Sequence, residues 1–313
     1  MQTEKRGAAG IAVARAVPSH PACRRRQRRR PPVLAGLLLT AFAVFFVLPV
    51  GWLLLATTKT DEQLLNGNPL SFGSFKQLEE NFTALMSFQD AQLWTWLGNS
   101  VFYSFAALVI TLAVSIPAGY VLGLVDFRFR KPLLVTTLVV MLMPATTLVI
   151  PLFLETNALG LAGTAWSVIL PFSFYPFGVY LTYIYFSTAV PAALLSAARI
   201  DGCTEWQVFT RIAVPLAKPI VALVGFFGFV ANWTNFFLPY VMLPGSDQYP
   251  AQVGLAQLLT SVPSFNPVVG AGFEVTRPEL ALAAVLTVAP VLFVFVFAQR
   301  TLVSGMLAGA TKE

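Results

Sequence analysis

The sequence predicts an all-α membrane protein with six transmembrane helices. Of its 313 residues, 57% are hydrophobic and only 11% are charged, whereas a soluble domain has about 25% charged residues. The chain also contains six apolar runs, each close to the roughly 20 residues that a helix needs to cross a hydrocarbon core of about 30 Å. Lysine and arginine gather between alternate runs, which is typical of cytoplasmic loops.

The apolar runs account for most of the chain after residue 32. They lie at about 33–56, 97–124, 133–155, 165–187, 215–243 and 280–299. The fifth run is the least uniform, because Asn232, Asn235 and Pro239 interrupt it. We therefore expect one transmembrane domain over residues 33–313, preceded by a disordered basic cytoplasmic tail over residues 1–32.

The N-terminal tail carries the run RRRQRRR at residues 24–30. Such a run also occurs in nucleic-acid-binding arms, but no aromatic residues interleave it for base stacking. Its place directly before an apolar run favours a topology anchor at anionic lipid. We therefore expect no nucleic-acid partner. The apolar run that follows is longer than the core of a signal peptide, so we interpret it as a span.

The distribution of basic residues predicts the orientation of the chain. With the N-terminus inside, only Lys59, Lys76 and Arg277 of the 20 lysines and arginines fall on the outer side. Cytoplasmic loops retain positive charge during insertion, so we expect both termini in the cytoplasm. The loop between the fourth and fifth runs, at about residues 190–214, then faces the cytoplasm as well.

This loop is a polar segment between apolar runs, and its residues predict two short helices joined by a turn. Asp201 can hydrogen-bond its own backbone two residues on, and Gly202 reaches positive φ without steric cost. Thr204 as N-cap, with Gln207 three residues later, has the pattern of a capping box. A soluble partner could bind a projecting element of this shape.

Two further features describe the second short helix. Pro215 predicts its end near Val214, because the residue before a proline is disfavoured in the α conformation. One face is expected to be apolar and the opposite face polar. The apolar face carries Trp206, Phe209 and Ile212, and the polar face carries Gln207 and Arg211.

The pattern Ala-Ala-x2-Asp-Gly-x6-Phe-x2-Ile-x2-Pro-Leu-x2-Pro, which begins at Ala197, resembles the EAA loop of ABC importer permeases. The glutamate that the family has directly before the two alanines is Ser196 here. The resemblance implies that an ATP-binding cassette ATPase grips this loop. The coupling residues that it implies are Ala197, Ala198, Asp201, Gly202, Thr204, Trp206, Gln207, Phe209 and Arg211.

The resemblance covers roughly residues 40–313 and points to the carbohydrate-uptake permeases, of the type of the smaller membrane subunit of maltose transporters. It implies the six-helix type I ABC importer permease fold with a cytoplasmic coupling helix, in the plasma or inner membrane of a prokaryote. The implied partners are a second permease subunit in a heterodimer, an ATPase dimer, an extracytoplasmic solute-binding protein that delivers a sugar or oligosaccharide, and the lipid bilayer. Segments that carry it include Asn99-Ser100, Met143-Pro144, Trp233-x-Asn235-x-Phe237 and Gln299-Arg300.

The chain is not expected to be an enzyme or to hold a cofactor. It contains no Gly-x4-Gly-Lys-Ser/Thr phosphate-binding loop, so ATP hydrolysis is expected in a separate subunit. One His and two Cys do not predict a metal site. The nearer alternative is the same architecture importing a polyol, a glycerol phosphate or another small solute. A stand-alone ion-coupled carrier or channel is the weaker alternative, because a carrier would be expected to bury carboxylates along its path.

Five residues are candidates for the translocation path. Asn232, Trp233 and Asn235 place polar groups in an apolar run, where an amide can hydrogen-bond a sugar hydroxyl and an indole can stack on it. Contact between helices is the alternative interpretation for these three. Glu155 at the outer end of the third span and Gln257 in the last outer loop complete the set, and a plain interfacial carboxylate is the alternative for Glu155.

The C-terminus and the prolines add two weaker predictions. Gly305, Gly309 and Lys312 lie in a tail that resembles the glycine-containing tail of the family, which implies a second contact with the ATPase. Prolines inside the runs are expected to bend their helices, which suits a path that opens and closes, although prolines are also simply common in membrane helices. They are Pro117, Pro144, Pro151, Pro171, Pro176, Pro239 and Pro290.

Overall fold

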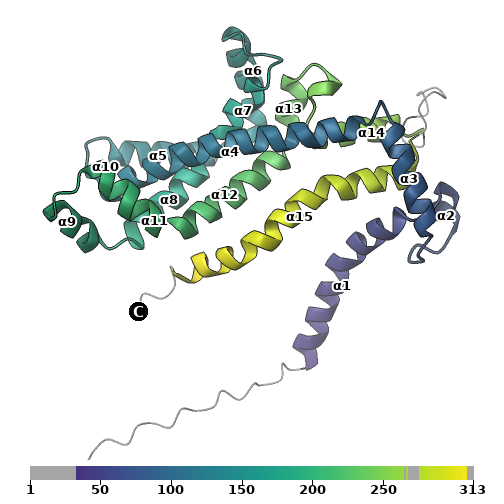
Figure 1. The fold of residues 1–313 in the computed structure, drawn as a ribbon, viewed down its shortest axis with the longest axis horizontal. Helices are drawn as coiled ribbons and strands as arrows, with labels where there is room; N and C mark the ends of the chain where they lie inside the picture. The colour runs from purple at the N-terminus through teal and green to yellow at the C-terminus, as the bar shows by residue number, and fades with distance from the viewer. Residues whose placement is uncertain (1–32, 264–265, 267–274, 309–313) are drawn as a thin grey trace, which may run out of the picture. The chain divides into compact units, whose positions relative to one another are not determined.

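The structure is a computed structural model that describes residues 33–263, 266 and 275–308, and all regular structure in this part of the chain is helical (Figure 1). The chain divides into two units, Met1–Val47 and Leu48–Glu313. The first unit contains the N-terminal part of α1 (Val33–Ala56), whose apolar side chains are almost all exposed. All described helices after α1 lie in the second unit.

In chain order the later elements are α2 (Asp61–Asn66), α3 (Phe75–Ser87), α4 (Gln92–Leu124), α5 (Arg130–Met141), the 3₁₀ turn η1 (Ala145–Leu148), α6 (Val149–Ala158), α7 (Trp166–Ser173), α8 (Pro176–Thr188), α9 (Ala192–Ile200), α10 (Glu205–Val208), the π-helix η2 (Phe209–Ala213), α11 (Val214–Leu216), α12 (Lys218–Trp233), α13 (Phe237–Met242), the 3₁₀ turn η3 (Ser246–Gln248), α14 (Ala251–Ser261) and α15 (Arg277–Ala308).

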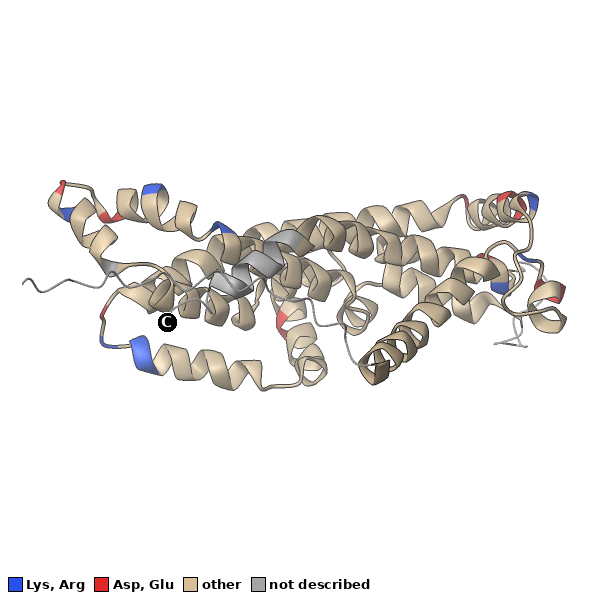
Figure 2. Ribbon diagram, turned by 90° about the horizontal axis from the view of Figure 1, so that it is seen from below, with Lys and Arg blue, Asp and Glu red and all other residues tan. Residues whose placement is uncertain are grey.

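The long helix α4 organises the second unit. It packs against α7, α8 and α12, and α12 in turn packs against α15. No charged residue occurs in α4 or between Glu279 and Arg300 of α15, and Figure 2 shows most charged residues in loops and at helix ends. Helices without charge over this length suit the hydrocarbon core of a bilayer.

Four helical segments among the described residues are long and apolar enough to cross a membrane, and two bent pairs raise this number to six if each pair is one span. The first segment, Val33–Ala56, has the predicted bounds, and Gln92–Leu124, Trp166–Thr188 and Arg277–Gln299 match the second, fourth and sixth predicted runs. The third and fifth runs are not straight helices. The two parts of the third run are bent by 99°, and at the start of the fifth run the segment Glu205–Leu216 meets α12 at a bend of 73°.

The break in the third run lies at Pro144. Its ring disfavours the helical conformation for the preceding residue, so α5 ends at Met141 and the chain restarts as η1 and α6 in a new direction. Glu155, expected at the outer end of the third span, lies near the C-terminal end of α6, after the bend. Its place at the outer side of a membrane stays a prediction.

The fifth run is divided at both ends. Ala217 separates the segment Glu205–Leu216 from α12, and α12 ends at Trp233 after 16 residues. A new short helix, α13, begins after Asn235, whose Oδ1 accepts a hydrogen bond of 3.3 Å from the backbone N–H of Leu238. Pro117 and Pro290, by contrast, lie inside the continuous helices α4 and α15.

Candidate functional site

The loop between α8 and α12 folds as the predicted helix–turn–helix. α9 ends at Ile200, and the N–H of the following residue, Asp201, donates to the carbonyl oxygen of Ala197 at 2.9 Å. Gly202 follows with a φ of +84°, in the left-handed region that glycine adopts without cost. An added Cβ at Gly202 would meet nothing within 4 Å. The turn therefore requires glycine for its backbone conformation and not for lack of space.

The second helix of the loop begins with the predicted capping box. The hydroxyl of Thr204 accepts from the N–H of Gln207 at 3.3 Å, and the side-chain oxygen of Gln207 accepts from the N–H of Thr204 at 2.9 Å. Two of the unpaired N–H groups at the helix start are thus satisfied reciprocally. This prediction is confirmed.

An ion pair joins the two helices across the turn. Nε of Arg199, in the last turn of α9, lies 2.6 Å from Oε1 of Glu205, the first residue of α10, and Nη2 lies 3.2 Å from Oε2. This bidentate geometry fixes the mutual orientation of the two groups. The hydrogen bond from Arg199 lowers the pKa of Glu205 below its ordinary value and raises the pKa of Arg199. This ion pair was not predicted, although opposite charges on the two sides of a predicted turn were a signal for it.

The predicted apolar face of the second helix is confirmed in part. Phe209 and Ile212 pack against the buried cluster that contains Val208 and Ala213, whereas Trp206 is 70% exposed. The prediction assumed α-helical spacing, but η2 is a π-helix with a wider turn. Phe209 still faces inward in part, with its ring centroid 5.0 Å from that of Tyr120 on α4.

The predicted end of this helix near Val214 is also wrong. Helical structure continues through Pro215 to Leu216, and the break comes at Ala217. In an α-helix the proline ring would clash with the carbonyl group four residues earlier. The π-helical turn directly before Pro215 widens the backbone at this point and so accommodates the ring.

The remaining coupling candidates divide into a capped, a buried and an exposed group. Thr204 and Gln207 form the capping box, and Ala198 is the buried residue of α9 among these candidates. The exposed group includes two large apolar side chains, Ile200 at 85% and Trp206 at 70% exposed. We use the name docking face for the exposed loop residues Ser196, Ala197, Ile200, Asp201, Trp206 and Arg211.

A cavity of about 290 Å³ lies where the broken helices meet. Its walls come from η1, α6, α7, the α7–α8 junction, α12 and α13. Asn232 and Asn235, two of the five path candidates, line it together. Asn232 is 8% exposed, and its Nδ2 is a buried polar atom with no hydrogen-bond partner. We call this space the asparagine cavity.

The other three path candidates lie elsewhere. Trp233 is 2% exposed and its Nε1 donates to the carbonyl oxygen of Thr287 at 3.0 Å, which is a contact between α12 and α15. Oε1 of Gln257 accepts from the hydroxyl of Ser246 at 3.0 Å. Glu155 is exposed on α6 and is not part of the cavity lining. At the C-terminus, Gly305 lies in α15, while Gly309 and Lys312 lie outside the described residues.

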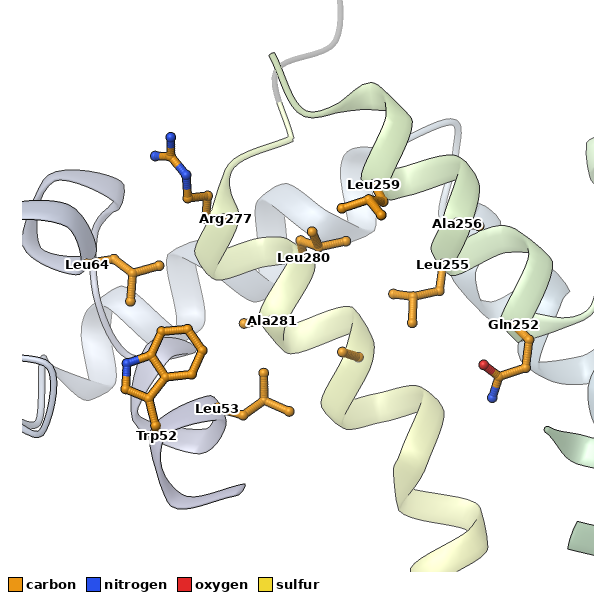
Figure 3. Close-up of a pocket in the computed structure, with 11 residues that line it drawn as sticks. Trp52, Leu53, Leu64, Gln252, Leu255, Ala256, Leu259, Arg277, Leu280 and Ala281 are labelled. Carbon is orange, nitrogen blue, oxygen red and sulfur yellow. The ribbon is translucent and has the colours of Figure 1, made fainter. Parts of the chain in front are cut away.

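A second cavity, of about 490 Å³, has a different character (Figure 3). Leucine side chains of α14 and α15 line it, and Gln252 and Arg277 are its only polar or charged residues apart from the indole of Trp52. Nη1 of Arg277 lies 2.7 Å from Oδ2 of Asp61, so this cation is already paired. Among the residues that the structure describes, no three His, Cys, Asp or Glu side chains gather as a metal site would require.

The chain resembles known membrane transport proteins over most of its length. Residues 115–307 match the family described as the binding-protein-dependent transport system inner membrane component. The arabinooligosaccharides transport system permease protein AraQ of Halalkalibacterium halodurans is 33% identical over 91% of this chain and 99% of its own length. The lactose transport system permease protein LacG of Rhizobium radiobacter is 29% identical over 90% of this chain and 97% of its own length.

A solved structure shows the same fold. It is the crystal structure of a bacterial ABC transporter involved in the import of the acidic polysaccharide alginate, with a TM-score of 0.74 at 22% identity over 86% of this chain and 95% of the compared chain. The match confirms the all-α importer permease fold that the loop pattern predicted. With its family match and its full-length relatives, the chain belongs to the binding-protein-dependent transport system inner membrane components, the permease subunits of ABC importers.

Proposed function

We propose that this chain pairs with a second permease to form the path for ATP-driven uptake of a sugar or oligosaccharide. A solute-binding protein delivers the solute from outside, and an ATPase dimer binds the docking face from the cytoplasm. Both chain termini lie in the cytoplasm. The observation that carries the proposal is the docking face itself, because two large apolar side chains exposed on a rigid helix–turn–helix are typical of a protein contact.

The class of solute is inferred from the relatives. Curated relatives that match nearly full length are named for arabinooligosaccharides and lactose, and the diacetylchitobiose uptake system permease protein NgcG of Streptomyces coelicolor is 26% identical over 90% of this chain. These solutes are all saccharides with two or more rings. We therefore assign this chain to the same class of solute.

The loop has the contacts that a mechanical coupling element needs. Beneath the docking face, Val208 and Ala213 belong to one buried cluster with Tyr120 of α4 and Phe186 of α8. The hydroxyl of Tyr185 on α8 donates to the carbonyl oxygen of Leu216 at 2.7 Å. A force applied to the loop by the ATPase is therefore transmitted to α4 and α8, because close-packed interiors deform little.

The same loop leads directly into the proposed solute path. Ala217 connects it to α12, whose last turn carries Asn232 into the asparagine cavity. We propose that the path passes this cavity, so that Asn232 and Asn235 border it. Trp233 takes the role of a helix contact, and Glu155 and Gln257 border the path only if it extends beyond the cavity.

A reconstituted transporter tests the proposed function. The full chain, its partner permease and the ATPase are placed in liposomes with ATP inside and the solute-binding protein outside. We expect uptake of at least one of arabinotriose, lactose and N,N′-diacetylchitobiose, with no uptake without ATP. Uptake driven by an ion gradient alone, or ATP-driven uptake of a glycerol phosphate but of none of these saccharides, would contradict the proposal.

A further inference from the structure

The amide of Asn232 is a buried polar group without a partner. Only 8% of the residue is exposed, it lines the asparagine cavity, and its Nδ2 donates no hydrogen bond. An unmet donor of this kind costs free energy unless something in the cavity accepts from it. The neighbouring Asn235 differs, because its Oδ1 already accepts from the N–H of Leu238.

The walls of the cavity restrict what that acceptor can be. None of its lining residues is Asp, Glu, Lys, Arg or His, so an ionised solute would lose its hydration without gaining a counter-charge from this chain. Phe172, Phe174, Tyr175 and Phe237 add aromatic rings to the lining. Aromatic faces beside a few placed amides suit a ligand that is apolar on its ring faces and polar at its edges.

The size of the cavity limits how much of such a ligand enters. Its volume of about 290 Å³ is at the lower end of the roughly 300–1,000 Å³ that holds small ligands. One sugar ring fits this space, whereas two linked rings would extend out of it.

We infer that the asparagine cavity is a subsite for one uncharged sugar ring of the transported solute, and that the amide of Asn232 hydrogen-bonds one hydroxyl of that ring. This inference rests on the proposed function. It adds that Asn232 binds the solute and that the bound sugar ring is uncharged. A hydroxyl both donates and accepts, so it satisfies either end of the amide, whereas a carboxylate only accepts. Asn232 is therefore a specificity residue of the path and not only part of the helix packing.

Deleting single hydroxyls from the solute tests this directly. Uptake into the proteoliposomes is measured for whichever of arabinotriose, lactose and N,N′-diacetylchitobiose is transported fastest, and for its monodeoxy analogues. In the natural protein, one analogue should show an uptake KM about tenfold above that of the parent sugar, as expected for a lost buried hydrogen bond. In Asn232→Leu, which has nearly the same volume, the KM for the parent should rise about tenfold, and the penalty for that one analogue should disappear.

The matched control is Thr287→Val. Thr287 is fully buried on α15, its hydroxyl also lacks a partner, and it lies outside the cavity lining. This variant should keep the discrimination among analogues unchanged. If Asn232→Leu fails to assemble with its partners, Asn232→Ser, which retains a shorter polar group, should show a reduced penalty for the same analogue.

The outcomes separate the two levels of the proposal. Absence of uptake of all three saccharides in the natural protein overturns the proposed function. If saccharides are taken up but every monodeoxy analogue has the same KM penalty in the Asn232 variants as in the natural protein, the subsite is overturned. Water alone then satisfies the amide. The subsite is supported if the KM penalty for one monodeoxy analogue disappears in the Asn232 variants but persists in Thr287→Val.

Discussion

The coupling loop and the asparagine cavity are built in opposite ways. The loop contains two local side-chain interactions, the capping box of Thr204 and Gln207 and the ion pair of Arg199 and Glu205. At the cavity, helices break and an amide stays unpaired. These contacts hold the loop in one shape, whereas the cavity leaves an amide donor open. This difference is what the proposed roles require, because a coupling element must transmit force and a solute site must bind a ligand.

The largest expected effect sharpens the role of the loop. Trp206→Ala should weaken binding of the ATPase by about 30-fold, since an exposed tryptophan at the centre of an interface contributes about 2 kcal/mol or more. Thermal stability of the permease should hardly change, because the side chain is 70% exposed. Binding is measured by titrating purified ATPase onto the permease pair in nanodiscs.

The control for this variant is Trp166→Ala, which removes an exposed tryptophan, 51% accessible, at the start of α7 and far from the loop in sequence. It should leave ATPase binding unchanged. Equal weakening in both variants would show that the docking face is not where the ATPase binds.

An intermediate effect is expected at the cavity. Asn235→Ala removes the acceptor for the N–H of Leu238 at the start of α13, which should lower the free energy of unfolding by about 1 kcal/mol, the typical net contribution of one intramolecular hydrogen bond. Asn235→Asp keeps the acceptor and should keep the stability. Chemical denaturation in detergent compares the two, and equal stability of all three proteins would show that the bond contributes nothing.

A smaller effect is expected from the ion pair of the loop. Both side chains are partly exposed, so water screens the pair and its coupling energy should be about 0.5 kcal/mol. A double-mutant cycle with Arg199→Ala, Glu205→Ala and the double variant measures this energy from ATPase binding. A coupling energy of zero would show that the turn holds its shape without the pair.

The smallest expected effect is that of pH. Arg199 lowers the pKa of Glu205 below its ordinary 4.5, so the pair's contribution is present above that pH and is lost only as pH falls through the lowered pKa. Binding of the ATPase to this loop should therefore stay constant between about pH 5 and 8. A titration with a midpoint in this range that disappears in Glu205→Gln would contradict the assigned pair.

The contrast between loop and cavity also explains what the sequence could predict. The turn at Gly202 and the capping box follow from residues within six positions of one another, and both were predicted correctly. The apolar face of the second helix was predicted in part: Phe209 and Ile212 pack inward, but the burial of Val208 and Ala213 was not predicted, because a π-helical turn changes the spacing of side chains. The cavity depends on residues from helices far apart in sequence, so no run of residues could reveal that Asn232 and Asn235 face the same space.

The same limit applies to the broken spans. Met143-Pro144 was visible in the sequence, but a proline also lies within the continuous α4 and α15. Whether a proline breaks a helix depends on neighbouring helices that satisfy the freed backbone groups. Composition therefore predicted the number of apolar runs, whereas the bends of 99° and 73° required the tertiary structure.

Transmission of force by the loop is tested most directly by a pair of glycine variants. Gly202 and Gly160 both have positive φ, at +84° and +69°, and an added Cβ meets nothing within 4 Å at either. Valine should therefore strain both positions by a similar amount, about 1–2 kcal/mol, while only Gly202 lies in the loop. ATP-driven uptake in proteoliposomes should fall at least tenfold in Gly202→Val and stay near the natural level in Gly160→Val, and equal uptake in the two variants would contradict the claim.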